Sequence, residues 1–265
     1  MDSLDQRLRP IARAIRDALR PAATAFPADA PPDRIHAFRL GGLRLEVPHR
    51  LLGPKTWLAL SNGTYERNEL ALLPRLLRPS DTVLEVGAAL GLVSARAARL
   101  AQRVVAVEAN AALIPVARRT HELNGVTAEL VNAVVGHADG EADFWTDEEF
   151  WASSTARRDG MRHQRLPARS LAGLIEEVRP DVLILDVEGG EVALLDGARF
   201  PGVRQVVLEV HRWNTGLRGI GTVFAHMEAA GFAYDPEFSE GQIVTFGRVE
   251  EDAIALDREG QASVG

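Results

Sequence analysis

The sequence predicts an α/β protein built around a doubly wound, mostly parallel β-sheet that ends in an antiparallel strand. From residue 68 onward, short apolar segments alternate with amphipathic helical segments, which is the order of a parallel sheet with helical crossovers. The apolar segments contain few polar residues, as expected for strands covered by helices on both faces. The first of them runs into a glycine-containing turn, the element that binds ligands in such sheets.

Length and composition exclude several classes of function. The 265 residues suffice for one large domain with an N-terminal extension. The net charge of -7 argues against nucleic acid as a partner, because phosphate binding needs a basic face. Cysteine is absent, so we expect no disulfide or thiolate chemistry and a cytoplasmic location. We expect neither a secretory signal nor a membrane-spanning segment, because no apolar run is long enough.

Residues 1–60 are expected to form an N-terminal extension. Apolar side chains at spacings of three and four predict an amphipathic helix over residues 4–20, which Pro21 ends. After a linker rich in proline and alanine, residues 34–49 alternate around two glycines and predict a β-hairpin. We expect the extension to cover the site of the main domain or to form the contact of a homodimer.

Residues 61–250 are expected to form the main domain, followed by a C-terminal tail over 251–265. The predicted helices span residues 68–77, 92–101, 111–123, 170–178, 191–198 and 221–231. The predicted strands span residues 82–86, 104–108, 128–135, 181–187, 205–211 and 242–249. A polar insert at 145–166 interrupts this alternation, and we interpret it as an active-site lid.

The turn after the first strand indicates the cofactor. The next strand ends in Glu108, about 20 residues further on, where a carboxylate contacts ribose hydroxyls in nucleotide-binding sheets. A nicotinamide dinucleotide requires glycine at positions where this chain has Ala89 and Leu92. The carboxylate of Glu85 repels a pyrophosphate but suits the positively charged amino and sulfonium groups of S-adenosylmethionine. The turn therefore favours S-adenosylmethionine over NAD.

Four segments resemble the FkbM family of methyltransferases. They are Gly63 to Glu66, DTVLEVGAALG at 81–91, VVAVEAN with the downstream HELNGV ending at 126, and LILDVEGGEVALLDGA at 183–198. The last segment is the most specific, because its acid-x-Glu-Gly-x-Glu pattern followed by Leu-x-Gly-Ala resembles the family signature. The chain departs from the family at Glu85 and Ala89, where aspartate and asparagine are usual, and at Ala109, where proline is common.

The resemblance implies a class I Rossmann-like enzyme that transfers the methyl group of S-adenosylmethionine, in most family members to hydroxyls of natural products or sugars. The acceptor is accordingly expected to be a small molecule or a sugar, and its identity does not follow from the resemblance. The residues expected at the cofactor are Tyr65, Glu85, Gly87, Ala88, Gly91, Leu92, Glu108, Ala109, Asn132, Ala133 and Asp186.

The candidate catalytic groups follow the fourth and fifth predicted strands of the main domain: Asp186, Glu188, Glu209 and His211. Methylation of a hydroxyl benefits from a general base, and His211 is preferred because its ordinary pKa lies near neutrality. Strand alternation places Glu209 beside His211, where we expect it to orient the imidazole. A purely structural role for His211 is the alternative. Asp186 is also a candidate contact of the donor or the acceptor, and Glu188 and Glu191 are candidate helix caps.

Other roles are left open by the sequence. Asp186, Glu209 and His211 include ligand types that suit a divalent metal, although we predict none. Trp151, Ser153 and Trp213 are expected to bind the acceptor, whereas the tryptophans of the insert would otherwise hold that loop to the domain. An NAD-dependent oxidoreductase and a non-catalytic adenosyl-binding protein are the alternative functions.

Overall fold

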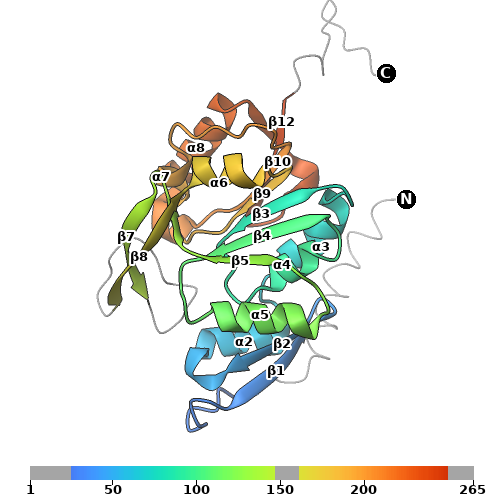
Figure 1. Cartoon of the computed structure of the whole chain (residues 1–265), viewed down its shortest axis with the longest axis vertical. Helices are drawn as coiled ribbons and strands as arrows, with labels where there is room; N and C mark the ends of the chain where they lie inside the picture. The colour runs from blue at the N-terminus through green and yellow to red at the C-terminus, as the bar shows by residue number, and fades with distance from the viewer. Residues whose placement is uncertain (1–24, 147–160, 250–265) are drawn as a thin grey trace, which may run out of the picture.

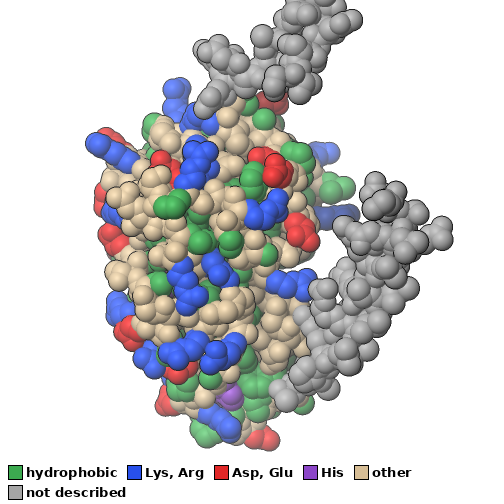
Figure 2. Space-filling model, turned by 90° about the vertical axis from the view of Figure 1, so that its right-hand side faces the viewer, with side chains coloured by type: hydrophobic (Ala, Val, Ile, Leu, Met, Phe, Trp, Pro, Cys, Tyr) green, Lys and Arg blue, Asp and Glu red, His purple; other side chains and the backbone are tan. Residues whose placement is uncertain are grey.

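The computed structural model describes residues 25–146 and 161–249. The helix expected over 4–20 and the tail at 251–265 lie outside the described residues. None of the helices in the described part of the chain has the length and apolar content needed to span a bilayer. On the face shown in Figure 2, basic side chains are interspersed with acidic and uncharged ones.

A seven-stranded sheet forms the centre of the molecule, in the order β11-β12-β10-β9-β3-β4-β5 (Figure 1). Its strands are β3 (Thr82–Val86), β4 (Arg103–Glu108), β5 (Glu129–Asn132), β9 (Val182–Leu185), β10 (Gln205–Glu209), β11 (Phe232–Tyr234) and β12 (Ile243–Arg248). Strand β3 pairs in parallel with β4 on one side and β9 on the other, so the order of the sheet reverses there. Strand β12 is antiparallel to both of its neighbours. The predicted doubly wound sheet with an antiparallel terminal strand is therefore confirmed.

Helices cover both faces of this sheet (Figure 1). They are α2 (Pro54–Asn62), α3 (Arg67–Leu76), α4 (Leu92–Ala97), α5 (Ile114–Leu123), α6 (Leu171–Val178), α7 (Glu191–Leu195) and α8 (Arg212–Ala229). Alternate residues of a strand point to opposite faces. Leu84 and Leu183 accordingly pack in the cluster that includes α6, α7 and α8, whereas Val83 and Val182 pack with α3 and α4. This two-sided burial explains why these strands are continuously apolar in sequence.

The expected hairpin at 34–49 is present as β1 (Ile35–Leu40) and β2 (Leu43–Pro48), which pair antiparallel. The buried side of β2 packs in one apolar cluster with residues of α2, α4 and α5. In Figure 1 the hairpin lies at one end of the molecule, beside α2 and α5. Short 3-10 turns follow β2 at His49–Leu51 and precede β12 at Pro236–Phe238. The hairpin is thus held to the main domain by hydrophobic contacts.

The strand predicted over 128–135 is divided between two sheets. Strand β5 ends at Asn132, and β6 (Val134–Gly136) joins β7 (Gly140–Thr146) and β8 (Arg162–Ser170) in the order β6-β8-β7. Strands β7 and β8 form the flanks of the polar insert, and its residues 147–160 lie outside the described part. The apolar pattern does not predict β7 and β8, because only Phe144 in β7 and Ala168 in β8 are buried. The interpretation of the insert as a lid stays a prediction.

The largest differences from the predicted helices are at α2 and α8. Helix α2 is not predicted, and α8 begins at Arg212, nine residues before the start expected from the pattern. Glycine lowers helix propensity, and Gly216 interrupts α8 with φ 65° and ψ 179°. Because of the glycines near the start of α8, the sequence pattern does not predict the first turns of this helix.

Candidate active site

A cavity of about 820 Å³ opens at the carboxyl ends of the parallel strands. It is lined by Gly87 from the turn after β3, by Glu108 at the end of β4, and by Asp186 and Glu209 after β9 and at the end of β10. The reversal of strand order at β3 is where open α/β sheets bind their ligands. The volume lies in the range of sites for small organic molecules. The cavity is therefore the candidate active site.

The structure separates the predicted cofactor residues into two groups. Those that line the cavity are Tyr65, Gly87, Glu108, Ala109, Ala133 and Asp186. Those that lie outside its lining are Glu85, Ala88, Gly91, Leu92 and Asn132. Ala88, Gly91 and Leu92 are buried beneath the cavity, where they shape the turn and the start of α4. The amide of Asn132 donates hydrogen bonds to the carbonyl oxygens of Glu108 and Ala109, at 2.8 and 2.9 Å.

Glu108 holds the glycine-containing turn against the end of β4. One carboxylate oxygen accepts a hydrogen bond from the backbone N–H of Ala89 at 2.8 Å, and the other accepts one from Asn110 at 2.7 Å. Burial raises the pKa of Glu108, and these backbone hydrogen bonds oppose that effect. A carboxylate has about four acceptor positions, so positions remain for the hydroxyls of a ribose. Glu108 thus lies at the cavity, and its contact with a ribose stays a prediction.

Glu85 has a different environment from the one expected. Its side chain is buried, and it does not line the large cavity. Burial raises its pKa to about 8, even though hydrogen bonding with Ser94 lowers it. The carboxyl group is therefore neutral at pH 7 and lies beneath the turn. Its predicted contact with the charged groups of the cofactor is not supported by this geometry, because strand alternation directs the side chain into the core.

The raised pKa of Glu85 predicts a pH-dependent stability. A carboxyl group with a raised folded-state pKa favours folding at low pH, and this contribution is lost as the pH rises toward about 8. Between pH 5.5 and 8.5 we expect Glu85→Gln to gain about 3 kcal/mol of unfolding free energy relative to the parent protein. Urea unfolding at both pH values measures this difference. The exposed Glu129→Gln is the control, and parallel pH curves for Glu85→Gln and the parent would contradict a buried, neutral Glu85.

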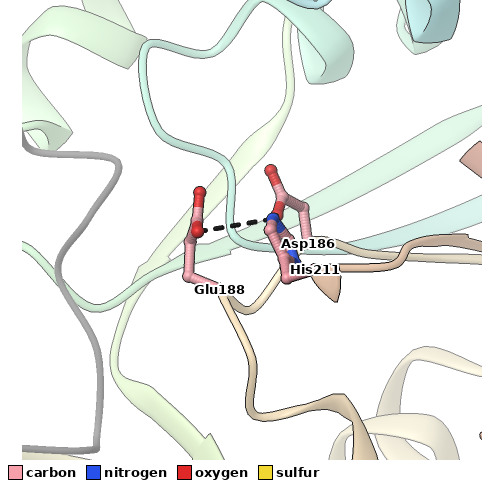
Figure 3. Close-up of side chains that lie close together, drawn as sticks. All are labelled: Asp186, Glu188 and His211. Atoms are coloured by element: carbon pink, nitrogen blue, oxygen red, sulfur yellow. Dashed lines mark ion pairs between the residues drawn. The ribbon is translucent and has the colours of Figure 1, made fainter. Parts of the chain in front are cut away.

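A histidine surrounded by carboxylates lies beside the cavity, whose lining includes Asp186, Glu188 and Glu209 but not His211 itself. Figure 3 shows His211 with two of these acids, Asp186 and Glu188. His211, at the start of α8, is 1% exposed. Its Nδ1 lies 2.6 Å from Oε1 of Glu191. Its Nε2 lies 3.3 Å from Oε2 of Glu188, 3.5 Å from Oδ1 of Asp186 and 4.0 Å from Oε1 of Glu209. Parallel strands and the helices after them therefore bring together all four predicted catalytic residues, as expected from the common edge of the sheet.

The electrostatics of this cluster change the roles expected for its members. Burial lowers the pKa of His211, but the neighbouring carboxylates of Glu188, Glu191 and Asp186 raise it to about 11. His211 is then protonated at pH 7, so its interpretation as the base loses its premise of a near-neutral pKa. Burial raises the pKa of Glu209 to about 7, although His211 lowers it. Burial and the charges of Glu209 and Glu188 also raise the pKa of Asp186.

Glu191, and not Glu209, orients the imidazole of His211. Glu191 is 1% exposed, and the same Oε1 that contacts Nδ1 also accepts a hydrogen bond from the N–H of Gly189 at 3.1 Å. The sequence interpretation of Glu191 as a helix cap therefore describes only part of its role. Glu188 lies in this loop with φ 50°, a left-handed conformation that non-glycine residues rarely adopt and that occurs often at functional sites.

The predicted acceptor residues are only partly described by the structure. Trp213 is 57% exposed, lines the cavity and packs edge-on against His211 with ring centroids 5.0 Å apart. Trp151 and Ser153 lie outside the described residues. Trp145, on β7, packs against His163 with ring centroids 5.2 Å apart and is not part of the cavity lining. Trp213 is therefore the predicted acceptor residue that this structure places at the site.

Several cavity residues are not identified by the sequence. Glu66 and Glu69 line the wall next to Tyr65, and burial raises the pKa of both carboxyl groups. Glu66 belongs to the segment that resembles the FkbM family, and this resemblance is the sequence signal that points to it as a site residue. His121, on α5, is also buried, and its Nε2 lies 2.9 Å from Oγ of Ser94.

Comparison with known structures finds similar folds at low sequence identity. The ribosomal protein L11 methylase of Lactobacillus delbrueckii subsp. bulgaricus is 13% identical with a TM-score of 0.43, over 71% of this chain and 79% of that chain. Precorrin-6y C5,15-methyltransferase of Geobacter metallireducens is 16% identical with a TM-score of 0.42, over 69% of this chain and 88% of that chain. The tRNA (uracil-54, C5)-methyltransferase of Pyrococcus abyssi, in complex with S-adenosyl-L-homocysteine, is 15% identical with a TM-score of 0.44. The match covers 80% of this chain and 43% of that chain.

Comparison with sequence families gives the assignment. A search of curated proteins finds no match. The family model described as the methyltransferase FkbM domain matches residues 85–234, which is more than half of the chain. The matched range contains the turn after β3, Glu108 and the cluster around His211. An NAD-dependent oxidoreductase is therefore the wrong alternative. The chain belongs to the FkbM family of methyltransferases, whose cofactor is S-adenosylmethionine.

Proposed function

We propose that the chain methylates a hydroxyl oxygen of a small molecule, a natural product or a sugar. The observation that carries this proposal is the position of Asp186, Glu188 and Glu209, whose side chains line the same cavity as the cofactor residues. Carboxylates accept hydrogen bonds from hydroxyl groups and are able to take up a hydroxyl proton. A cavity wall of this chemistry suits an acceptor that carries several hydroxyl groups.

The residues of the cavity fit S-adenosylmethionine. Glu108 has free acceptor positions for ribose hydroxyls, and Ala109 and Ala133 give a small apolar wall beside it. Oδ1 of Asp186 is buried and has no hydrogen-bond partner in the described part of the chain, so it is available to a cationic or donor group of a ligand. When bound, the cofactor supplies an electrophilic methyl group on a sulfonium, which the protein itself cannot provide.

Two further residues of the cavity, Glu209 and Trp213, suit a hydroxyl acceptor, one as a proton acceptor and the other as a stacking surface. Formation of the new carbon–oxygen bond releases the hydroxyl proton, and we propose Glu209 as the group that accepts it. Glu209 lies at the end of β10, where the sheet fixes its backbone through pairing with β9 and β12. The exposed ring of Trp213 supports stacking of a sugar or ring system at the cavity. Correct positioning of the two reactants lowers the activation barrier by roughly 7–11 kcal/mol in well-oriented reactions.

The first experiment is calorimetric titration with S-adenosylhomocysteine, with NAD as the control ligand. We expect S-adenosylhomocysteine alone to bind. The second experiment measures transfer of a labelled methyl group to polyhydroxylated acceptors, to their deoxy analogues and to matched amines. Labelling of the hydroxyl compounds and not of the deoxy analogues supports the proposal. Labelling of amines or carbon atoms alone would contradict O-methylation, and cofactor binding with no transfer to any acceptor would favour the non-catalytic alternative.

Glu209→Gln separates proton transfer from cofactor binding. We expect this variant to lower the rate of methyl transfer about 10²-fold, because the amide cannot accept the hydroxyl proton. Its affinity for S-adenosylhomocysteine should be nearly unchanged. Single-turnover assays and calorimetry measure the two quantities. Glu228→Gln, on the exposed side of α8, is the control, and an equal rate for Glu209→Gln and the parent protein would exclude Glu209 as the acceptor of the proton.

A further inference from the structure

The side chains of Asp186, Glu188 and His211 have the arrangement of a metal-ligand set (Figure 3). Each offers one ligand atom, and these atoms all lie within 4.8 Å of one another. Nε2 of His211 is 3.3 Å from Oε2 of Glu188 and 3.5 Å from Oδ1 of Asp186. Neighbouring ligands of a metal ion with bonds of about 2.1 Å lie about 3.0–3.4 Å apart. The observed separations are close to that spacing.

The same separations are long for hydrogen bonds. A charge-assisted hydrogen bond between an imidazolium and a carboxylate measures about 2.7–2.9 Å. Oδ1 of Asp186 and Oε2 of Glu188 are both buried, and neither has a hydrogen-bond partner among the described residues. A single N–H at Nε2 has only one proton to donate, so it cannot satisfy two carboxylates. A cation between the three atoms would contact all of them at once.

Charge balance also favours a cation at this position. Asp186, Glu188, Glu191 and Glu209 all have a carboxylate oxygen within 4.0 Å of a ring nitrogen of His211. One imidazolium offsets only one of these negative charges. Buried carboxylates that share a small space are stabilised by pairing with a cation or by metal coordination. A divalent ion that takes the place of the Nε2 proton brings two positive charges, instead of the one of the imidazolium, to the point where the carboxylates converge.

Glu191 prepares His211 for coordination through Nε2. Its Oε1 lies 2.6 Å from Nδ1, and both side chains are 1% exposed. When a metal ion displaces the Nε2 proton of the imidazolium, a carboxylate that still accepts the Nδ1–H fixes the tautomer in which the Nε2 lone pair binds the ion. This carboxylate–histidine arrangement is common behind metal-ligating histidines. Glu191 is therefore a positioning residue and not a ligand.

We propose that Asp186, Glu188 and His211 bind one divalent transition-metal ion at the wall of the cavity. Carboxylate oxygens suit Mn²⁺, and an imidazole nitrogen favours a transition metal over Mg²⁺ or Ca²⁺. Asp186 and Glu188 line the cavity, so free coordination positions of the ion would be open to a molecule bound there. There the ion would bind the acceptor hydroxyl and lower its pKa. This role rests on the proposed function, whereas binding of the ion does not.

The test is titration of the chelator-treated full chain with MnCl₂, followed by the electron paramagnetic resonance signal of free Mn²⁺. We expect one ion bound per chain. Glu188→Gln and Asp186→Asn should weaken binding at least 10-fold, because each removes one charged ligand. Glu191→Gln should weaken it about 10- to 100-fold through the orientation of His211. Circular dichroism confirms that each variant is folded.

Asp143→Asn is the matched control. Asp143 also lines the cavity and also pairs with a histidine, since its Oδ1 lies 2.8 Å from Nε2 of His163. We expect Mn²⁺ affinity in this variant to equal that of the parent protein. The inference is overturned if no ion binds, or if Glu188→Gln and Asp186→Asn bind Mn²⁺ as tightly as Asp143→Asn does. Methyl transfer to hydroxyls in the presence of excess chelator would overturn the role of the ion while leaving the proposed function intact.

Discussion

Replacement of Gly87 by alanine is expected to abolish cofactor binding and to lower the unfolding free energy by more than about 4 kcal/mol. Gly87 has φ 94°, and a Cβ built there would lie 1.8 Å from the carbonyl oxygen of Asp186. That oxygen belongs to the backbone next to β9 and cannot move away without displacing the Asp186 side chain. One methyl group would thus disturb the glycine turn and the acidic cluster together. Urea unfolding and calorimetry with S-adenosylhomocysteine measure both effects.

Gly125→Ala is the matched control for this substitution. Gly125 also has a positive φ, of 62°, but a Cβ there would meet nothing within 4 Å. Its replacement should therefore cost only the conformational penalty of about 1–2 kcal/mol and leave cofactor binding unchanged. If Gly87→Ala and Gly125→Ala proved equally stable, the close approach of the turn to Asp186 would not be a constraint on the fold.

Glu108→Gln is expected to weaken the binding of S-adenosylhomocysteine about 10- to 100-fold, which corresponds to the loss of about 1.5–3 kcal/mol for hydrogen bonds to a charged group. In the parent protein both carboxylate oxygens accept backbone hydrogen bonds, one from Ala89 and one from Asn110. An amide places an NH₂ group against one of these donors and removes the charge that faces the ribose hydroxyls. Calorimetric titration at pH 7 gives the affinity of both proteins.

The exposed Glu122→Gln on α5 controls for the change of charge alone, because its partner Arg119 is also on the surface. Its affinity for S-adenosylhomocysteine should equal that of the parent protein. An unchanged affinity of Glu108→Gln would show that Glu108 serves only to hold the turn, and that the ribose is bound by other groups in the cavity.

The strands of the central sheet follow from the sequence because their signal is local. Buried parallel strands are apolar on both faces, so β3, β4, β9 and β10 are visible as short hydrophobic runs. The glycine turn after β3 is visible for the same reason, since it directly follows such a run. Strands β7 and β8 have only one buried side chain each and lack that signal. Backbone hydrogen bonds with each other and with β6 form these strands into a separate sheet, and this pairing is not a local property of their sequence.

The site, like the fold, has features that the sequence predicts and features that depend on tertiary packing. The sequence determined that acids and a histidine end neighbouring strands, and that the turn after β3 and Glu108 face one cavity. Only the tertiary structure decided that Glu191 orients His211, because 20 residues separate them and both are buried where α7 meets the start of α8. It also decided that Glu85 points into the core, where burial makes its carboxyl group neutral at pH 7. Residue order sets which groups reach the edge of the sheet, whereas side-chain direction and burial, which depend on packing between distant elements, set their partners and charges.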